Sequence, residues 1–328
     1  MFYPTSRHAH LALPVALLFL VLTEVRSLQA CACGCQIFDM GMVDIPTTYN
    51  PDRLTLQYSF MNQDANQSGS SLTSPALNPN KQNETSFYTV DLAHEFNNSW
   101  GVTLDVPYLQ RHFTTDNNGT PNLPDPSPDI QSQTVNTVGD IRLMGMYTGF
   151  SEDMAIGLEF GVKLPTAPFG GPNWILDRDT APGTGTTDLL IGAFDRGRFS
   201  ADWGWYGQTL LEAPLYSRDG YEPANNLDIA GGFHFDGIKR WTHLTPILQA
   251  NVTIRGHDSG GDDSLDVVDG NGNYNSGYEN FYLTPGLEAD FWSNIQATAF
   301  VYLPVSRNVN GDQLVASWLA NAEVSYLF

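Results

Sequence analysis

Long apolar runs are nearly absent from this chain of 328 residues. The longest occupies positions 11–22, and it is too short for a helix that crosses a bilayer, which needs about 20 apolar residues. Charged residues are also sparse, at 16% of the chain. The sequence therefore does not predict a helical membrane protein.

Positive charge is the second shortage. The chain has 15 Lys and Arg residues against 36 Asp and Glu residues, which gives a formal net charge of −21. Such a chain repels phosphate backbones and anionic surfaces. Nucleic acid is therefore not an expected partner, and the acidic balance favours solubility or the attraction of cations.

Cysteine is confined to one place. All three cysteines lie in the motif C-A-C-G-C, as Cys31, Cys33 and Cys35. No disulfide framework can therefore hold the body of the chain together. Its stability has to come from backbone pairing and from the burial of apolar side chains.

The N-terminal region has the features of a secretory signal. Arg7 precedes the apolar run at 11–22, and the small residue Ala30 follows it. This order is typical of a signal peptide that is removed on export. We therefore expect a signal peptide over 1–30, a mature chain that begins near Cys31, and a location outside the cytoplasm.

Alternation of apolar and polar residues with period two is what the sequence does contain. The last twelve residues, S-W-L-A-N-A-E-V-S-Y-L-F, place Trp318, Val324, Tyr326 and Phe328 on one side of an extended strand. A final strand with one apolar side can close a barrel by pairing with the first strand, because an open sheet edge is not tolerated in a membrane. The aromatic ending also resembles the terminal signal of bacterial outer-membrane β-barrels.

Twelve segments of this kind follow the predicted signal peptide. Each covers roughly ten residues, the length that a tilted strand needs to cross a membrane. The expected spans are 53–62, 86–96, 100–112, 139–149, 154–164, 187–196, 199–213, 226–236, 243–256, 279–291, 294–305 and 317–328.

The connections between these spans alternate between short and long. Short turns, flanked by Phe and Trp, are expected at 97–99, 150–153, 196–198, 237–242 and 292–293, and long polar loops at 63–85, 113–138, 165–186, 214–225, 257–278 and 306–316. This alternation is typical of a barrel with tight periplasmic turns and extended outer loops. Within 165–186, the motif Gly183-Thr184-Gly185 lacks the lysine of a phosphate-binding loop and is interpreted as a turn.

We therefore predict an all-β protein, a 12-stranded antiparallel transmembrane β-barrel of the outer-membrane type over 53–328. The segment 31–52 is expected at the periplasmic mouth as a cysteine-containing segment or plug. An even number of strands places both termini in the periplasm, and the strands are expected to contact outer-membrane lipid. The alternative is a secreted soluble β-sandwich or barrel, whose apolar face points inward.

The same alternation predicts which charged side chains face the inside of the barrel. The candidates for selectivity are Asp105, Arg111, Arg142, Glu159, Lys163 and Glu288. Two interpretations remain open. These residues either pack the interior as ion pairs, because buried charges need partners, or line a water-filled path that favours cations or neutral polar solutes.

A family resemblance accompanies these strands. The segments D-V-P-Y-L-Q-R, G-D-I-R-L-M-G-M-Y, G-L-E-F-G-V-K-L-P-T, G-T-G-T-T-D-L-L-I-G and L-T-P-G-L-E resemble those of an outer-membrane transporter family that is linked to phenol meta-cleavage pathways. The resemblance covers most of 86–328. It implies a barrel that moves small molecules.

The cysteine motif is chemically unusual, because three thiols lie within five residues. Thiolates bind soft metals, so Cys31, Cys33 and Cys35 are candidate ligands for copper or zinc. Two alternatives remain: Cys31 carries a lipid anchor, or two of the cysteines form a local disulfide.

The function predicted from the sequence is that of an outer-membrane channel or transporter for passive diffusion of a small solute or cation. The alternative is a barrel scaffold in which the cysteine site handles copper or transfers electrons with a periplasmic redox protein. An outer-membrane phospholipase would need an activated serine and histidine on the lipid-facing side. No serine is suitably spaced from His94, so we predict no catalytic residues and do not expect an enzyme.

Overall fold

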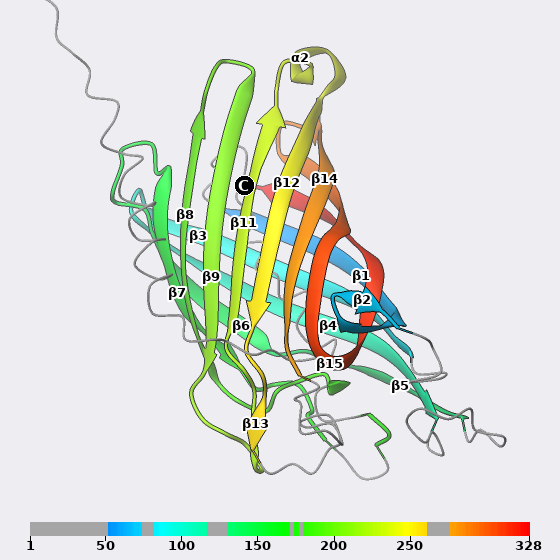
Figure 1. Ribbon diagram of the computed structural model, residues 1–328. Coiled ribbons are helices and arrows are strands. Elements are labelled where there is room, and N and C mark those ends of the chain that lie inside the picture. The colour runs from blue at the N-terminus through cyan, green and yellow to red at the C-terminus, as the bar shows by residue number, and fades with distance from the viewer. Residues whose placement is uncertain (1–51, 74–81, 117–129, 171–173, 177–179, 261–275) are drawn as a thin grey trace, which may run out of the picture.

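The computed structural model describes residues 52–73, 82–116, 130–170, 174–176, 180–260 and 276–328. Most of them belong to one antiparallel sheet that curves round on itself (Figure 1). Residues 53–69 pair with 309–327, so the first and last strands meet and the sheet closes into a ring. Ring closure removes the open edges that a membrane would not tolerate.

The strands of the ring follow chain order. They are β1 (Arg53–Gly69), β3 (Gln82–Asn97), β4 (Trp100–Asp116), β5 (Ile130–Val138), β6 (Ile141–Tyr147), β7 (Ile156–Leu164), β8 (Asp188–Arg198), β9 (Trp203–Pro214), β11 (Asn226–Phe235), β12 (Leu244–Arg255), β14 (Tyr278–Trp292) and β15 (Ile295–Leu327). The short strand β2 (Ser71–Leu72) pairs back onto β1, and β10 (Tyr221–Glu222) pairs with β13 (Ser259–Gly260) in a separate small sheet.

The ring has the twelve membrane spans that were predicted, but two of its strands join into one span and one strand forms two. β5 and β6 follow each other along the same partner, β4, and so form one span. β15 runs along β14 as far as Val309 and returns along β1, so it forms two spans. Gly311 lies at this reversal with a φ of 54°, a conformation that favours glycine. The long loop expected at 306–316 is therefore wrong, because strand pairing continues on both sides of a tight reversal. The loop expected at 113–138 is also wrong in part, because its last nine residues form β5 and pair with β4.

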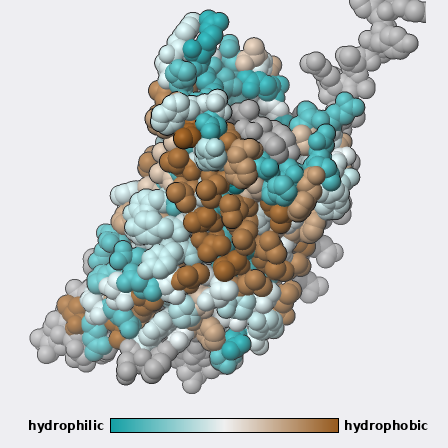
Figure 2. Space-filling view, turned by 180° about the vertical axis from the view of Figure 1, so that it is seen from behind, coloured by the Kyte–Doolittle hydropathy of each residue, from teal (hydrophilic) through white to brown (hydrophobic). Residues whose placement is uncertain are grey.

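Apolar side chains point out of the ring. Leu56, Phe233, Leu248 and Val324 are about half exposed, and Figure 2 shows a hydrophobic band across one flank with more hydrophilic residues toward both ends. Many of the inward side chains are polar and buried. This distribution is opposite to that of a soluble β-sandwich, and it agrees with the predicted transmembrane barrel.

The two ends of the ring differ. Short connections join β3 to β4, β6 to β7, β8 to β9, β11 to β12 and β14 to β15, and we call this side the short-turn end and the opposite side the long-loop end. Exposed aromatic side chains gather at the short turns, as amphipathic rings do at lipid headgroups. They are Phe96, Trp100, Phe150, Phe199, Trp241, Trp292 and Phe328.

The connection between β11 and β12 contains α2 (Lys239–Thr242), a helix of four residues. Its C-cap His243 has a φ of 59°, and its backbone N–H donates to the carbonyl of Lys239. In the described part of the chain, no helix has the length and apolar character needed to cross a membrane.

Candidate functional site

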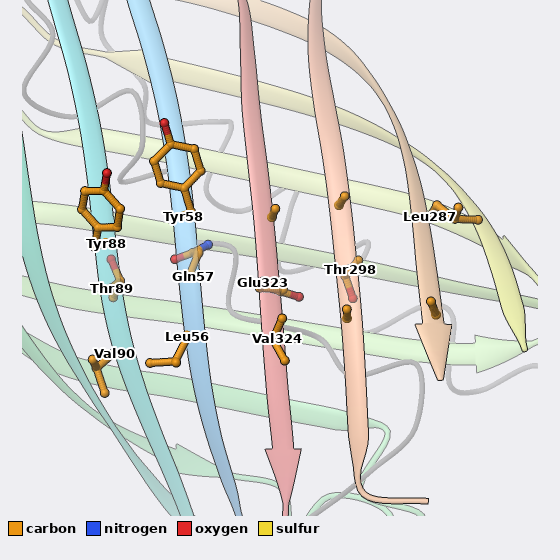
Figure 3. Close-up of a pocket in the computed structure, with 14 residues that line it drawn as sticks. Leu56, Gln57, Tyr58, Tyr88, Thr89, Val90, Leu287, Thr298, Glu323 and Val324 are labelled. Atoms are coloured by element: carbon orange, nitrogen blue, oxygen red, sulfur yellow. The ribbon is translucent and has the colours of Figure 1, made fainter. Parts of the chain in front are cut away.

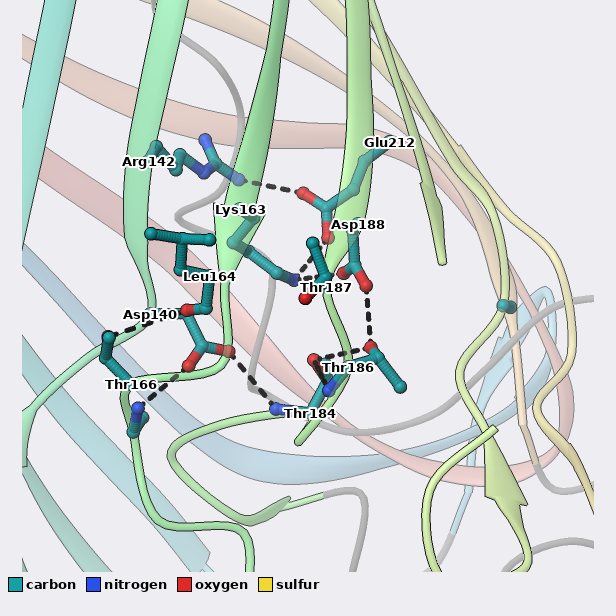
Figure 4. A network of polar contacts seen from close by, with 12 residues as sticks. Asp140, Arg142, Lys163, Leu164, Thr166, Thr184, Thr186, Thr187, Asp188 and Glu212 are labelled. Atoms are coloured by element: carbon teal, nitrogen blue, oxygen red, sulfur yellow. Dashed lines mark hydrogen bonds and ion pairs between the residues drawn. The ribbon is translucent and has the colours of Figure 1, made fainter. Parts of the chain in front are cut away.

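A network of four buried charges lies on the inner wall toward the long-loop end. Arg142, Lys163, Asp188 and Glu212 come from the neighbouring strands β6, β7, β8 and β9 (Figure 4). The Lys163 Nζ atom lies 2.7 Å from Asp188 Oδ2 and also donates to Glu212. Arg142 Nη2 donates to Glu212 Oε2 at 2.9 Å. Each of the four side chains is at most 9% exposed.

Strand register brings these charges together. Arg142 is the cross-strand partner of Lys163, and Lys163 is the partner of Asp188. Two cations therefore lie beside two anions, which is the condition under which buried charges are tolerated. At this level of the barrel, the interpretation of the interior as ion-paired packing describes the structure well.

An apolar layer follows, two residues further toward the short-turn end. Met144, Leu190 and Leu210 form a buried cluster from β6, β8 and β9. Each is separated by one outward residue from a member of the charged network on its own strand. The layer keeps the network apart from the polar residues beyond it.

Glu159 lies beyond this layer and has a different environment. Its side chain is 3% exposed, and its Oε2 atom accepts a hydrogen bond of 3.2 Å from Gln208. Its cross-strand partner is Gly192, whose missing Cβ leaves the space that the carboxyl group fills, since a Cβ there would lie 2.8 Å from Oε2. Among the described residues, no lysine, arginine or histidine forms an ion pair with Glu159.

Arg111 and Asp105 both lie on β4 but differ in burial. Arg111 is fully buried, and its Nε atom donates to Thr85 Oγ1 at 2.9 Å. Its Nη1 atom donates to backbone carbonyls of the connection between β7 and β8. Asp105 is only partly buried and is the cross-strand partner of Asp91 on β3 and of Arg142 on β6.

Glu288, on β14, belongs to a separate cluster near the short-turn end. Lys239 of α2 donates to Glu288 Oε1 at 3.0 Å and lies 2.9 Å from Asp290 Oδ2. Burial alone would lower the pKa of Lys239, but hydrogen bonds and charges of Asp290 and Glu288 outweigh it and raise the pKa.

The six residues predicted for selectivity therefore do not form a single site. Their role in selectivity stays a prediction.

The opposite wall of the ring carries an aromatic cluster. Tyr282, Phe300, Tyr302 and Leu319 belong to a buried cluster on β14 and β15. The rings of Tyr282 and Tyr302 meet edge to face with centroids 6.3 Å apart. Sequence alternation did not predict this cluster, because Phe300 and Tyr302 alternate with Val301 and Leu303, and both faces of that strand are apolar.

Neutral polar side chains line the wall next to this cluster. Tyr206 donates to Gln249 Oε1 at 2.5 Å, Gln249 donates to Asn251 Oδ1 at 2.8 Å, and Thr284 donates to the same oxygen at 2.9 Å. One side of the interior thus carries the network of four charges, and on the other side tyrosines, amides and hydroxyls lie among the buried carboxylates Asp228, Glu288 and Glu323.

A groove of about 630 Å³ lies on the outside of the barrel, across β3, β1, β15 and β14 (Figure 3). Leu56, Tyr58, Val90 and Leu287 border it, and alanines of β14 and β15 leave it hollow. These side chains belong to the exposed apolar face. The groove therefore faces lipid and forms no part of a path through the ring.

The predicted metal ligands Cys31, Cys33 and Cys35 lie outside the described residues, and binding of copper or zinc there stays a prediction. Within the described ranges, no three His, Cys, Asp or Glu side chains are arranged to hold a metal ion.

No known protein family and no curated protein matches the sequence. Among solved structures, the chain is similar to an outer-membrane channel from Pseudomonas putida F1, with a TM-score of 0.59 and 12% identity over 87% of this chain and 98% of that one. Two further structures are less similar and support no conclusion about this chain. They are the β domain of the Bordetella autotransporter Brka (TM-score 0.49, 11% identity, 85% of this chain and 100% of that one) and the NanC porin (TM-score 0.44, 9% identity, 84% of this chain and 100% of that one).

At such identities, similarity establishes the fold alone. The predicted all-β barrel of the outer-membrane type is confirmed, and so is the resemblance to outer-membrane transporter barrels at the level of the fold. The narrower link to phenol meta-cleavage pathways stays a prediction.

Proposed function

We propose that this protein is a narrow passive channel that carries a small polar solute or cation across the bacterial outer membrane. The observation that supports the proposal is the distribution of side chains around the closed ring. Apolar residues such as Leu56 and Val324 are exposed on the outside, whereas charged residues such as Lys163 and Glu159 are buried inside. The outward apolar residues are suited to contact with lipid, and the inward charged residues are suited to contact with water or a polar solute.

The size of the ring supports a narrow path. Side chains nearly fill barrels of eight strands, whereas porins of 16 strands hold a wide aqueous channel. Twelve spans lie between these limits. The buried network of Arg142, Lys163, Asp188 and Glu212 and the aromatic wall opposite take up part of the interior.

The proposed orientation follows from the connections. Outer-membrane barrels have short turns in the periplasm and longer loops outside the cell. The short-turn end would therefore face the periplasm, together with the start of β1 at Arg53 and the chain end at Phe328, whose backbone N–H donates to the carbonyl of Asp52.

The channel proposal is tested by reconstituting the purified mature protein in planar lipid bilayers. We expect small unitary currents and a preference for cations over anions, because the chain is strongly acidic. Protein unfolded by heat in the same detergent is the control. Absence of current from both the mature protein and a variant that lacks residues 31–50 would overturn the proposal.

Soft-metal binding by the cysteine motif is a separate proposal, supported by three thiols within five residues. In that case the barrel would serve as a scaffold for a periplasmic redox partner. This metal-binding proposal does not depend on whether the barrel conducts ions.

A further inference from the structure

Within the connection between β7 and β8, residues 180–186 do not extend into water as an outer loop usually does. Four of their side chains, those of Thr180, Ala181, Thr184 and Thr186, are between 0% and 4% exposed. The inward-pointing and fully buried side chain of Arg111 contacts it. Residues 180–186, which we call the inner segment, therefore lie against the inside of the barrel wall.

Arg111 attaches the start of the inner segment to the wall. Its Nη1 atom donates to the carbonyl of Thr180 at 2.5 Å and to that of Ala181 at 3.1 Å. Hydrogen bonds from a guanidinium group are stronger than those between neutral groups. Because Arg111 is held on its other side by Thr85 of β3, its position is fixed by the barrel wall.

Asp140 attaches the segment a second time. It lies at the junction of β5 and β6, where its Oδ1 atom accepts from the backbone N–H of Ala167 at 2.9 Å and its Oδ2 atom from that of Thr184 at 3.3 Å (Figure 4). One carboxylate thus joins the outgoing and returning parts of the connection. Both contacts are backbone contacts, so they depend on the path of the chain and not on neighbouring side chains.

Gly183 explains why the motif Gly183-Thr184-Gly185 is required here. A Cβ at Gly183 would lie 2.7 Å from the Cβ of Ala167 and 2.8 Å from its carbonyl oxygen. Gly185 has a φ of 76°, in the left-handed region that favours glycine. The glycines therefore allow the two parts of the connection to pack closely. The turn predicted from the sequence is an inward-folded and tightly packed segment.

The inner segment is also joined to the charged network. The Thr186 hydroxyl donates to Asp188 Oδ1 at 2.6 Å and lies 3.0 Å from Thr184 Oγ1, and Asp188 pairs with Lys163. The segment T-A-P-G-T-G-T contains no charged side chain. It places neutral groups inside the barrel wall, while its neighbours on the wall carry charges.

We propose that residues 180–186 form the constriction of the barrel, and that Asp140 and Arg111 are positioning residues that hold it inside the lumen and so set the size limit for solutes. This inference rests on the proposed channel function. A neutral constriction of threonine, proline and glycine selects small polar solutes by size, and leaves charge selection to the wall.

The experiment combines Asp140→Ala with two independent readouts. The first is the reactivity of Ala181→Cys toward a water-soluble maleimide, in a background that carries Cys31→Ser, Cys33→Ser and Cys35→Ser. Ala181 is 1% exposed, so its cysteine should react slowly, and Asp140→Ala should speed the reaction about tenfold or more because the segment detaches.

The second readout is passage of solutes. Asp140→Ala should raise unitary conductance by about twofold or more and should raise liposome swelling with a disaccharide relative to a monosaccharide. Asp140→Asn, which keeps the size of the side chain, should give a smaller change in the same direction. Asp153→Ala is the matched control, because Asp153 also accepts a backbone N–H, from Ala155, but in a short turn.

Heat-dependent mobility on gels shows whether each variant is folded. Faster labelling together with unchanged conductance and size limit would overturn the constriction while leaving the channel intact. Slow labelling in folded Asp140→Ala would overturn the positioning role of Asp140. If no variant conducts, including the unaltered protein, the proposed channel function itself fails, and the constriction with it.

Discussion

Replacement of Glu159 by glutamine should weaken the preference of the channel for cations. The change removes a carboxyl group, which is negatively charged when ionised, and keeps the shape of the side chain. The amide oxygen can still accept the hydrogen bond from Gln208, which is 3.2 Å long in the structure. The glutamine should therefore fit the space above Gly192, and any effect can be attributed to charge.

Glu159 is chosen because of its surroundings. Arg142, Lys163 and Glu288 are paired with opposite charges. Among the described residues, Glu159 has only a neutral hydrogen-bond donor, so a cation that enters the lumen would supply the partner that these residues do not. A carboxylate without an ion-pair partner attracts a passing cation more strongly than a carboxylate that is already paired with a lysine or arginine.

The size of the effect follows from Coulomb's law. A monovalent cation about 4 Å from a carboxylate gains about 1 kcal/mol in bulk water and about 4 kcal/mol at an effective dielectric constant near 20. Glu159 is 3% exposed and borders the apolar layer, so the value for water is a lower limit. Since about 1.4 kcal/mol corresponds to a factor of ten, the cation-to-anion permeability ratio should fall about fivefold or more in Glu159→Gln.

The assay is the reversal potential across a planar bilayer with a tenfold gradient of KCl. Glu84→Gln is the matched control, because Glu84 is exposed on the outer face of β3 and its loss should leave the potential unchanged. The difference between the two variants should shrink at high salt, which screens the charge. An unchanged reversal potential in folded Glu159→Gln would refute the assignment of selectivity to this carboxylate.

Three further outcomes are expected. Lys163→Met should lower the free energy of unfolding by about 3–5 kcal/mol, because it leaves two buried carboxylates poorly compensated. Arg198→Met should lower it by less than about 1 kcal/mol, because the ion pair of Arg198 with Asp236 is partly exposed. Equal losses for the two variants in urea titrations would contradict this reasoning. Gly161→Ala should destabilise β6 and β7 by about 1–3 kcal/mol, because its Cβ would lie 2.2 Å from the carbonyl oxygen of Leu143. Gly207→Ala should not destabilise the barrel, because no atom lies nearer than 3.9 Å to the added Cβ. Equal unfolding midpoints for the two variants would contradict this prediction. Serine at all three cysteines should remove copper or zinc that copurifies with the mature protein, and an unchanged metal content by elemental analysis would exclude those ligands.

The strands could be predicted because period-two alternation is local. On β7, Leu158, Phe160 and Val162 point outward while Glu159 and Lys163 point inward, and this follows from the geometry of any extended chain. Burial of Arg111, Arg142 and Glu288 follows from the same alternation. The partners of these side chains could not be predicted, because a pair such as Arg142 and Glu212 depends on the register of four strands at once.

The sequence by itself determined most of the strands, their inward and outward faces, and the aromatic residues at the short turns, because each depends on neighbours along the chain. Only the tertiary structure decided that residues 180–186 fold inward, that β15 reverses tightly at Gly311, and that Glu159 has no ion-pair partner among the described residues. These features depend on atoms brought together by ring closure from strands far apart in the sequence. A carboxylate at one position carries no local signal of whether a lysine faces it from another strand.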